Sequence, residues 1–216
     1  MEIEKGTFIR DYDITAISET LNLYQKIEGD VSCVVWDASI VLAKYLEKRN
    51  SEKKDFLNGN KVVELGAGLG CVGLTAACLG AQVISTDLPE CIPLLNLNIS
   101  KNEQVWSKYG QIKSSPLKWG ESNDLNIIPD KILLADCVYY EESIQPLIET
   151  LVELTGPETE IFLCQEMRES ENQQKYWKIF MTNLEKHFKM RHVPPTEQDE
   201  DFFSLDIVLY KLEKRR

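Results

Sequence analysis

Five short apolar runs alternate with segments of helical period between Lys61 and Phe188, and this alternation constrains the fold more than any other feature. Repeated strand–helix–strand units form a parallel sheet with helices on both faces, because each crossover helix packs back onto the sheet. The pattern therefore predicts a doubly wound α/β domain. The predicted strands are Lys61–Leu65, Gln82–Thr86, Gln111–Ser115, Lys131–Ala135 and Glu160–Cys164.

The segments outside this alternation predict two hairpins. His187–Val193 and Leu205–Leu212 flank a polar loop and predict a closing hairpin, and Thr7–Ile27 alternates weakly and predicts an N-terminal one. We expect residues 1–30 to form an N-terminal extension and residues 31–216 to form the main domain.

Composition and charge limit the classes of partner. The chain has 216 residues, a formal net charge of -11, six cysteines without a CxxC pair and two histidines. The acidic charge argues against nucleic acid as the main partner and suits a basic one, such as a lysine-bearing segment. No apolar run approaches the roughly 20 residues that span a bilayer, and the N-terminus lacks an apolar signal region. We expect a cytoplasmic protein with reduced cysteines and no metal site.

A glycine-rich loop follows the first predicted strand, in the run Val62–Gly70, whose sequence is VVELGAGLG. Glycine permits a sharp turn and a close approach of the backbone to a ligand, and the next helix offers free N–H groups. Such a loop can bind NAD, FAD or another nucleoside cofactor. Glu64 precedes the first glycine by two positions; a carboxylate there disfavours a pyrophosphate and favours a cationic ligand such as S-adenosylmethionine.

Other polar residues follow the remaining strands. Asp87 ends the second strand, at the spacing where an acid accepts the ribose hydroxyls of a nucleoside. Trp119 follows the third strand, Asp136 follows the fourth, and the run Gln165–Arg168 follows the fifth. Because ligands of parallel sheets bind outside the carboxyl ends of the strands, these residues predict one pocket along one edge.

We assign specific roles to two tryptophans and to two residues after the fourth strand that would contact a methyl-accepting lysine. Trp119 stacks on adenine or packs under a loop, and Trp36 lines the pocket or packs the start of a helix that Asp37 caps. A lysine amine has a pKa of about 10.4 and attacks only when neutral. We expect Asp136 to orient the incoming ammonium, a partly desolvated site to favour the neutral amine, and Tyr139 to hydrogen-bond or flank the amine.

These motifs resemble the seven-β-strand, class I protein-lysine methyltransferases of the methyltransferase-like group. The resemblance rests on ELGAGLG, Asp87, LKWGE and the Asp-x-x-Tyr of Asp136–Tyr139, and it covers roughly Cys33 to Arg168. CVVWDASIVLAKYLE and ADCVYYEES are most similar to the branch that modifies valosin-containing protein, a hexameric AAA ATPase. Gln165 departs from the pattern, where that branch carries an aromatic residue.

The resemblance implies a Rossmann-like, mostly parallel sheet of seven strands with the last one antiparallel. It implies S-adenosylmethionine as cofactor and a lysine-bearing protein such as valosin-containing protein as substrate. We also expect a monomer. It places Asp136 and Tyr139 on the acceptor side. The expected cofactor-binding residues are Trp36, Glu64, Gly66, Ala67, Gly68, Asp87, Trp119 and Ala135.

Other functions stay open at this point. An enzyme that methylates a flipped base usually carries a Pro-Pro-aromatic element after the fourth strand, and this chain has Asp136-Cys137-Val138-Tyr139 there. A methyltransferase for a small molecule predicts an enclosed pocket. A scaffold without catalysis predicts cofactor binding without turnover.

Overall fold

The apolar runs form the strands of one seven-stranded sheet in the computed structural model, which describes residues 6–29 and 31–215. The strands are β3 (Lys61–Leu65), β4 (Gln82–Asp87), β5 (Gln111–Pro116), β6 (Lys131–Ala135), β7 (Glu160–Glu166), β8 (Phe188–His192) and β9 (Ile207–Lys214). Their spatial order is β5-β4-β3-β6-β7-β9-β8, with β3 to β7 parallel and β9 antiparallel to both neighbours. The predicted doubly wound sheet with an antiparallel last strand is confirmed.

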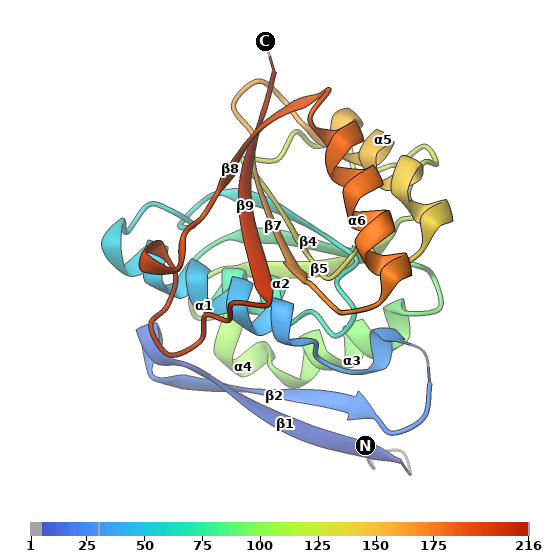
Figure 1. Cartoon of the computed structure of the whole chain (residues 1–216). Helices are drawn as coiled ribbons and strands as arrows, with labels where there is room; N and C mark the ends of the chain where they lie inside the picture. Colours follow the sequence, from blue (N-terminus) through green and yellow to red (C-terminus); the bar gives the residue numbers. More distant parts are fainter. Residues whose placement is uncertain (1–5, 30, 216) are drawn as a thin grey trace.

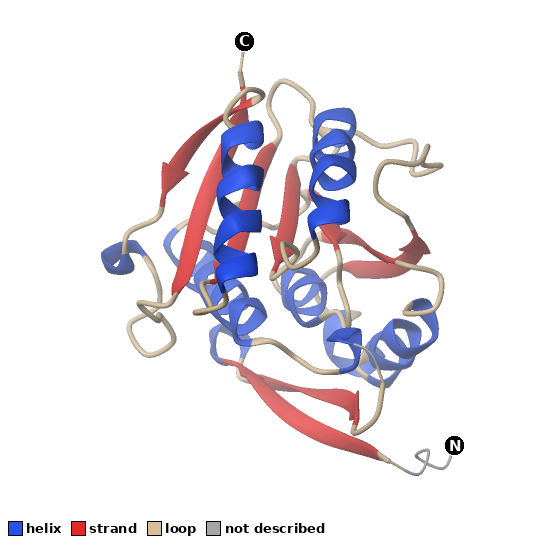
Figure 2. Cartoon of the chain, turned by 45° about the vertical axis from the view of Figure 1, so that its right-hand side comes forward, coloured by secondary structure: helices blue, strands red, loops and turns tan. Residues whose placement is uncertain are grey.

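The helices cover both faces of this sheet, as Figure 1 and Figure 2 show. The α-helices are α1 (Asp37–Glu52), α2 (Cys71–Cys78), α3 (Ile92–Lys101), α4 (Glu103–Trp106), α5 (Ile144–Leu154) and α6 (Glu171–Leu184). Single 3-10 turns lie at Thr15–Ile17, Val31–Cys33, Glu141–Ser143 and Pro195–Glu197. α1, α2 and α3 pack on one face, and α5 and α6 pack together on the other.

Alternation along the strands divides the hydrophobic core into two layers. Val62 and Leu133 face the α1–α3 layer, whereas Val63 and Leu134 face the α5–α6 layer. Successive strand side chains point to opposite faces, and both faces are covered, so nearly every position of β3 and β6 is buried. This explains why the central strands are short continuous apolar runs in the sequence.

A separate antiparallel hairpin, β1 (Thr7–Ile14) and β2 (Glu19–Lys26), packs against the α1–α3 layer. Asn98 and Asn102 on α3 and at its end each donate to and accept from the backbone of β2, at 2.7–3.1 Å, so they satisfy its inner edge like a third strand. The hairpin lies at one end of the molecule in Figure 2. The predicted extension includes residues 1–5 and 30, and the predicted domain includes residue 216; these lie outside the described residues.

The start of α1 differs from the expectation. Trp36 is the N-cap residue, and Asp37 is the first residue of the helix, where it makes no side-chain cap. A carboxylate in the first turn still favours the helix through its dipole. The helix runs to Glu52, and its last residues, Asn50–Glu52, are polar. Every residue of α1 from Ala38 to Glu47 except Ser39 is buried, and this packing stabilises the long helix.

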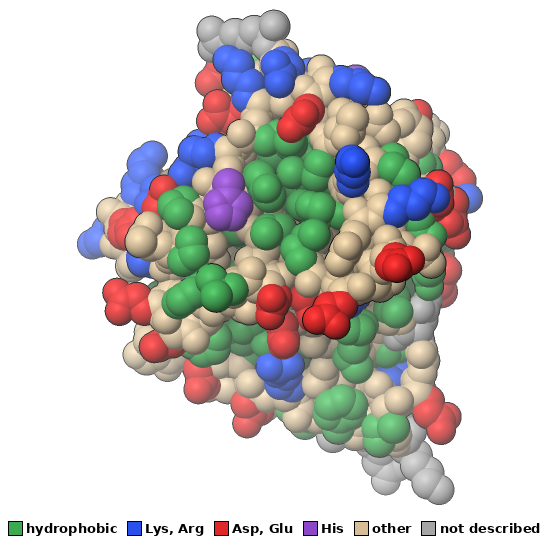
Figure 3. All heavy atoms as spheres, viewed as in Figure 1, with side chains coloured by type: hydrophobic (Ala, Val, Ile, Leu, Met, Phe, Trp, Pro, Cys, Tyr) green, Lys and Arg blue, Asp and Glu red, His purple; other side chains and the backbone are tan. Residues whose placement is uncertain are grey.

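Figure 3 shows hydrophobic side chains gathered on the face formed by β9 and α6. Trp177 of α6 and Tyr210 of β9 lie there half-buried, with ring centroids 6.2 Å apart. In the part of the chain that the structure describes, no helix is long and apolar enough to cross a membrane.

Candidate active site

A cavity of about 330 Å³ opens at the carboxyl edge of the sheet, where the chain order reverses between β3 and β6. Loops from adjacent parallel strands diverge at this point and leave room for a ligand. A second hollow near Glu158 and Lys189 lies at the opposite edge, before β7, and contains none of the expected site residues. The expected residues that line the first cavity are Trp36, Gly66, Ala67, Gly68, Asp87, Trp119, Ala135, Asp136 and Tyr139.

The glycine loop brings bare backbone to the cavity. Gly66 has a φ of +62°, and a Cβ there would lie 2.8 Å from the Cys137 sulfur and 3.2 Å from the Trp119 ring. Gly68 has a φ of +53° and donates its N–H to Asp87 Oδ2 at 2.7 Å. Glycine is therefore required at Gly66 by the neighbouring side chains as well as by the backbone conformation.

Asp87 links the turns after β3 and β4. Its carboxylate accepts N–H bonds from Gly68 and from Leu88, each at 2.7 Å, and interacts with the Cys91 thiol. Burial raises the pKa of Asp87, and the two backbone bonds partly offset the rise. An ionised carboxylate accepts about four hydrogen bonds, so one position stays available to a ligand hydroxyl.

Glu64 is not brought to the cavity and does not line it, unlike the other expected cofactor-binding residues. It points into the protein beneath the loop, is 3% exposed, accepts the Ser85 hydroxyl at 2.5 Å and interacts with the Gly73 N–H of α2. Burial raises the pKa of its carboxyl to about 7. The position of Glu64 two residues before Gly66 suggested contact with the cofactor, but its side chain faces the α2 side of the sheet.

The tryptophans hold two parts of the wall. Trp119 is half-buried and its ring packs over Gly66. Trp36 donates its indole N–H to the Val31 carbonyl at 2.8 Å, which ties the turn before α1 to the cavity. Both residues therefore join the cavity wall, although each also has the packing role that the sequence left open.

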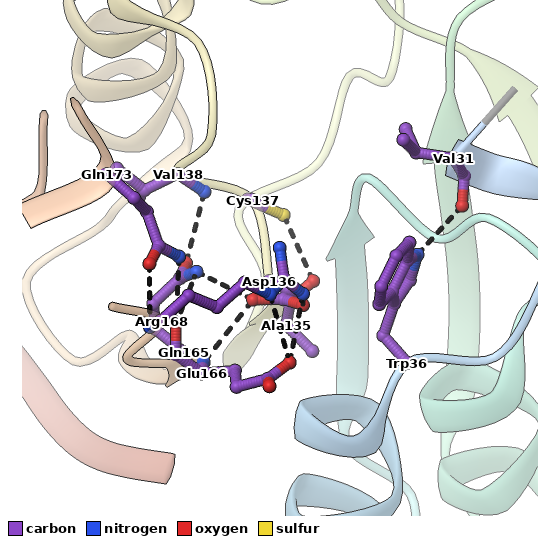
Figure 4. A network of polar contacts seen from close by, with 10 residues as sticks. All are labelled: Val31, Trp36, Ala135, Asp136, Cys137, Val138, Gln165, Glu166, Arg168 and Gln173. Carbon is purple, nitrogen blue, oxygen red and sulfur yellow. Dashed lines mark hydrogen bonds and ion pairs between the residues drawn. The ribbon is translucent and has the colours of Figure 1, made fainter. Parts of the chain in front are cut away.

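Asp136 is the centre of a charged network on the other side of the cavity (Figure 4). It follows β6 with a φ of +57°, which is rare outside glycine, and it is 9% exposed. Oδ1 accepts from Gln165 Nε2 at 2.6 Å and from the Glu166 N–H at 3.3 Å, and Oδ2 accepts from Arg168 Nη2 at 2.5 Å. Burial raises the pKa of Asp136, and the Arg168 guanidinium offsets part of the rise.

Tyr139 lines the cavity beside Asp136 and is half-buried. Its ring centroid lies 4.6 Å from that of Tyr140, which is half exposed at the rim. The two rings give the rim near Asp136 an aromatic border, a surface that suits a cation or an alkyl chain.

The sequence placed the run Gln165–Arg168 at the pocket edge without giving any of its residues a separate role, and the run does not line the cavity. The structure places Gln165, Glu166 and Arg168 around Asp136. Cys91 and Cys137 also line the cavity without having been expected there. The sequence signal for these residues was their position after the fifth predicted strand. Their contact with Asp136 could not be predicted in this way, because it depends on the pairing of β6 with β7.

Among residues 6–29 and 31–215, no three His, Cys, Asp or Glu side chains gather closely enough to hold a metal ion. The cavity is lined by backbone of the glycine loop, carboxylates, aromatic rings, cysteine thiols and Lys118.

Solved structures share this fold. A Thermus thermophilus 16S rRNA N2 G1207 methyltransferase in complex with AdoMet and guanosine superposes with a TM-score of 0.66 and 17% identity, covering 100% of this chain and 52% of that chain. The glycopeptide N-methyltransferase MtfA gives a TM-score of 0.59 at 12% identity, covering 78% of this chain and 89% of that one. At these identities the similarity concerns the fold alone.

Sequence comparisons identify the family. The family model described as lysine methyltransferase matches residues 16–187. The protein N-lysine methyltransferase METTL21A of Danio rerio is 36% identical, over 76% of this chain and 71% of its own length. The EEF1A lysine methyltransferase 3 of Mus musculus is 34% identical, over 86% of this chain and 73% of its own length. This chain belongs to the lysine methyltransferase family and is an S-adenosylmethionine-dependent enzyme of the class I fold.

Proposed function

We propose that this enzyme transfers a methyl group from S-adenosylmethionine to the side-chain amine of a lysine in a protein substrate, with the residues of the cavity in the roles argued below. The observation that carries the proposal is the convergence of the glycine loop, Asp87 and Asp136 on one cavity at the switch point of the sheet. The cavity thus has a nucleoside-binding side and a carboxylate at the other side.

The residues present fit the cofactor. A Cβ at Gly66 would collide with the cavity wall, so the backbone there forms a cradle for a ligand that approaches closely. Asp87 retains one acceptor position for a ribose hydroxyl, and a second hydroxyl would replace the Cys91 thiol. Trp119 and Trp36 offer ring faces to adenine. When bound, S-adenosylmethionine supplies an electrophilic methyl group on a sulfonium.

We propose an indirect role for Glu64 in place of direct cofactor binding. Its carboxylate interacts with Gly73 N–H in the first turn of α2, directly after the glycine loop. The first turn of a helix has N–H groups without a partner inside the helix, so Glu64 satisfies one of them and supports the loop from below. Ala67 and Ala135 contribute small side chains that keep the cavity open beside the loop and β6.

Asp136 is proposed to bind the acceptor amine. Its carboxylate has about four acceptor positions and three donors, Gln165, the Glu166 N–H and Arg168, so one position is left for an amine N–H. A lysine must lose its proton before attack, and a partly buried site favours the neutral amine. Asp136 then orients the neutral amine and Tyr139 flanks its alkyl chain. Positioning is the main contribution of these residues.

The test is incubation of a cell lysate with the enzyme and radiolabelled S-adenosylmethionine, followed by hydrolysis and identification of the labelled amino acid. We expect label in methyl-lysine of a protein band. Label confined to low-molecular-weight material would favour the small-molecule methyltransferase. Cofactor binding by calorimetry without any label would favour the scaffold without catalysis.

Candidate substrates come from the motif resemblance and from the relatives. Valosin-containing protein is suggested by the resemblance, and EEF1A is suggested by the name of the Mus musculus relative. Each is offered separately as a purified protein in the same assay, and a substrate is accepted when the label maps to one lysine. We further propose a cytoplasmic monomer, which size-exclusion chromatography with light scattering and imaging of the tagged protein would test.

A further inference from the structure

We propose that Arg168 is a positioning residue for methyl transfer, because it holds the Asp136 carboxylate and the Trp36 ring in one arrangement at the mouth of the cavity. The inference rests on the proposed function, in which Asp136 binds the acceptor amine and Trp36 belongs to the cofactor side. Arg168 touches both and thereby fixes one side relative to the other.

The guanidinium of Arg168 contacts three side chains (Figure 4). Nη2 donates to Asp136 Oδ2 at 2.5 Å and to Glu166 Oε2 at 2.9 Å, and Nε donates to Glu166 Oε2 at 3.2 Å. The central carbon lies 4.6 Å from the centroid of the Trp36 ring. A planar, delocalised cation with several donors matches this set of partners, whereas a lysine ammonium offers neither the fork nor the flat face.

The backbone around Arg168 is fixed as well. Its N–H donates to Gln173 Oε1 at 2.7 Å, and Gln173 Nε2 donates to the Glu166 carbonyl at 2.9 Å. Gln173 lies in the first turn of α6 and is 7% exposed. This amide clamps the turn between β7 and α6, so the Arg168 side chain, one third exposed, starts from a rigid base.

The ion pair between Arg168 and Asp136 also affects the protonation state of Asp136. The charged groups that act on Asp136 are Arg168, which follows β7, and Glu166, the last residue of β7. The thiols of Cys137 and Cys164 adjoin it, and burial raises the pKa of both, so they stay neutral. Loss of Arg168 removes a cation and a hydrogen bond that both lower the pKa of Asp136, while burial and the Glu166 charge continue to raise it. A protonated Asp136 would donate a hydrogen bond where the amine needs an acceptor.

The first experiment measures the charge directly, without turnover. The aspartate carboxyls are labelled with carbon-13, the Asp136 signal is assigned by its loss in Asp136→Asn, and its pKa is followed by NMR in the cofactor-free enzyme. Arg168→Gln is expected to raise this pKa by about one to two pH units. Arg168→Lys and the remote control Arg191→Gln, which breaks an exposed pair with Glu197, should stay near the parent. An equal pKa in Arg168→Gln and the parent would overturn the inference.

The second experiment measures initial rates of label transfer to lysate protein between pH 5 and pH 9. Arg168→Gln should lower the rate about 100-fold at neutral pH through misplacement of Asp136, and should move the acidic limb to higher pH. Arg168→Lys should restore the acidic limb but only part of the rate. A parental rate in either variant, or a slower Arg168→Gln with the parental pH profile, would contradict the positioning role.

The two levels of failure are separable. A parent enzyme that labels no lysine defeats the proposed function, whatever the variants do. A parent that labels lysine while the Arg168 variants match it defeats only the inference. If Arg168→Gln fails to fold, Arg168→Lys still decides the question, because it keeps the charge and loses the fork.

Discussion

The two sides of the cavity are formed by different kinds of group, mainly backbone on the cofactor side and mainly side chains on the acceptor side. On the cofactor side, Gly66 and Gly68 present backbone, and Asp87 accepts its bonds from backbone N–H groups of short turns. On the acceptor side, Asp136 is held mainly by the side chains of Gln165 and Arg168, and Arg168 is one third exposed. Backbone turns lose little freedom on binding, whereas long side chains keep rotamer freedom that must be restrained. The cofactor side is therefore rigid by construction, and the acceptor side is held by a charged network.

The largest expected effect is a loss of methyl transfer without a loss of cofactor affinity. Asp136→Ala should lower methyl transfer at least about 100-fold, because the acceptor amine loses its partner and Arg168 loses its counter-charge. Cofactor affinity, measured by calorimetry, should stay within a few-fold of the parent. Asp55→Ala, on the exposed loop before β3, is the matched control and should change neither quantity. If Asp136→Ala transferred methyl groups at the parental rate, Asp136 would have no role in binding the acceptor.

The pH dependence of stability tests whether Glu64 is a buried acid beneath the glycine loop. The pKa of Glu64 is about 7 in the folded enzyme and near the ordinary 4.5 when unfolded, so the native state holds the proton more tightly. Stability should therefore fall as pH rises from about 5 to 8, by about 3 kcal/mol from this group. Glu64→Gln should lack that fall in urea unfolding, whereas exposed Glu121→Gln should retain it. Parallel pH curves for parent and Glu64→Gln would mean that Glu64 is not a buried acid.

The glycine loop offers a smaller, local test. Gly68→Val should weaken cofactor binding about 10-fold or more, because a β-branched side chain strains a φ of +53° and stands where the ligand approaches. Gly59→Val is matched, since Gly59 has a φ of +75° and open space around its Cβ, far from the cavity. Both variants should lose similar stability in thermal melts, and only Gly68→Val should lose affinity. Equal affinities would show that the loop is only a tight turn.

The smallest effect concerns Trp36. Trp36→Phe keeps an aromatic ring and removes the indole bond to Val31, so we expect cofactor affinity to fall about 3-fold to 10-fold. Trp106→Phe removes an equivalent 2.8 Å bond, to the Ile99 carbonyl, at α4. Its affinity should match the parent, which titration calorimetry would check. A larger loss in Trp106→Phe than in Trp36→Phe would place the ligand elsewhere.

Residue Glu64 shows where prediction from sequence stops. Its place in ELGAGLG correctly located a strand and a loop, but the direction of its side chain depended on Ser85 of β4 and Gly73 of α2. The network around Asp136 is similar: the sequence placed Asp136 and Gln165–Arg168 at one edge, and only the pairing of β6 with β7 brought them into contact.

The sequence by itself determined the strand–helix alternation, the glycine turn, and the edge at which Asp87 and Asp136 gather. These follow from local periodicity, from backbone sterics and from the fixed handedness of parallel crossovers. Only the tertiary structure decided that Glu64 lies beneath the loop, that Asn98 and Asn102 close the edge of β2, and that Arg168 joins Asp136 to Trp36. Polar side chains choose among partners distant in sequence, and that choice is made by burial and the need to satisfy each donor and acceptor.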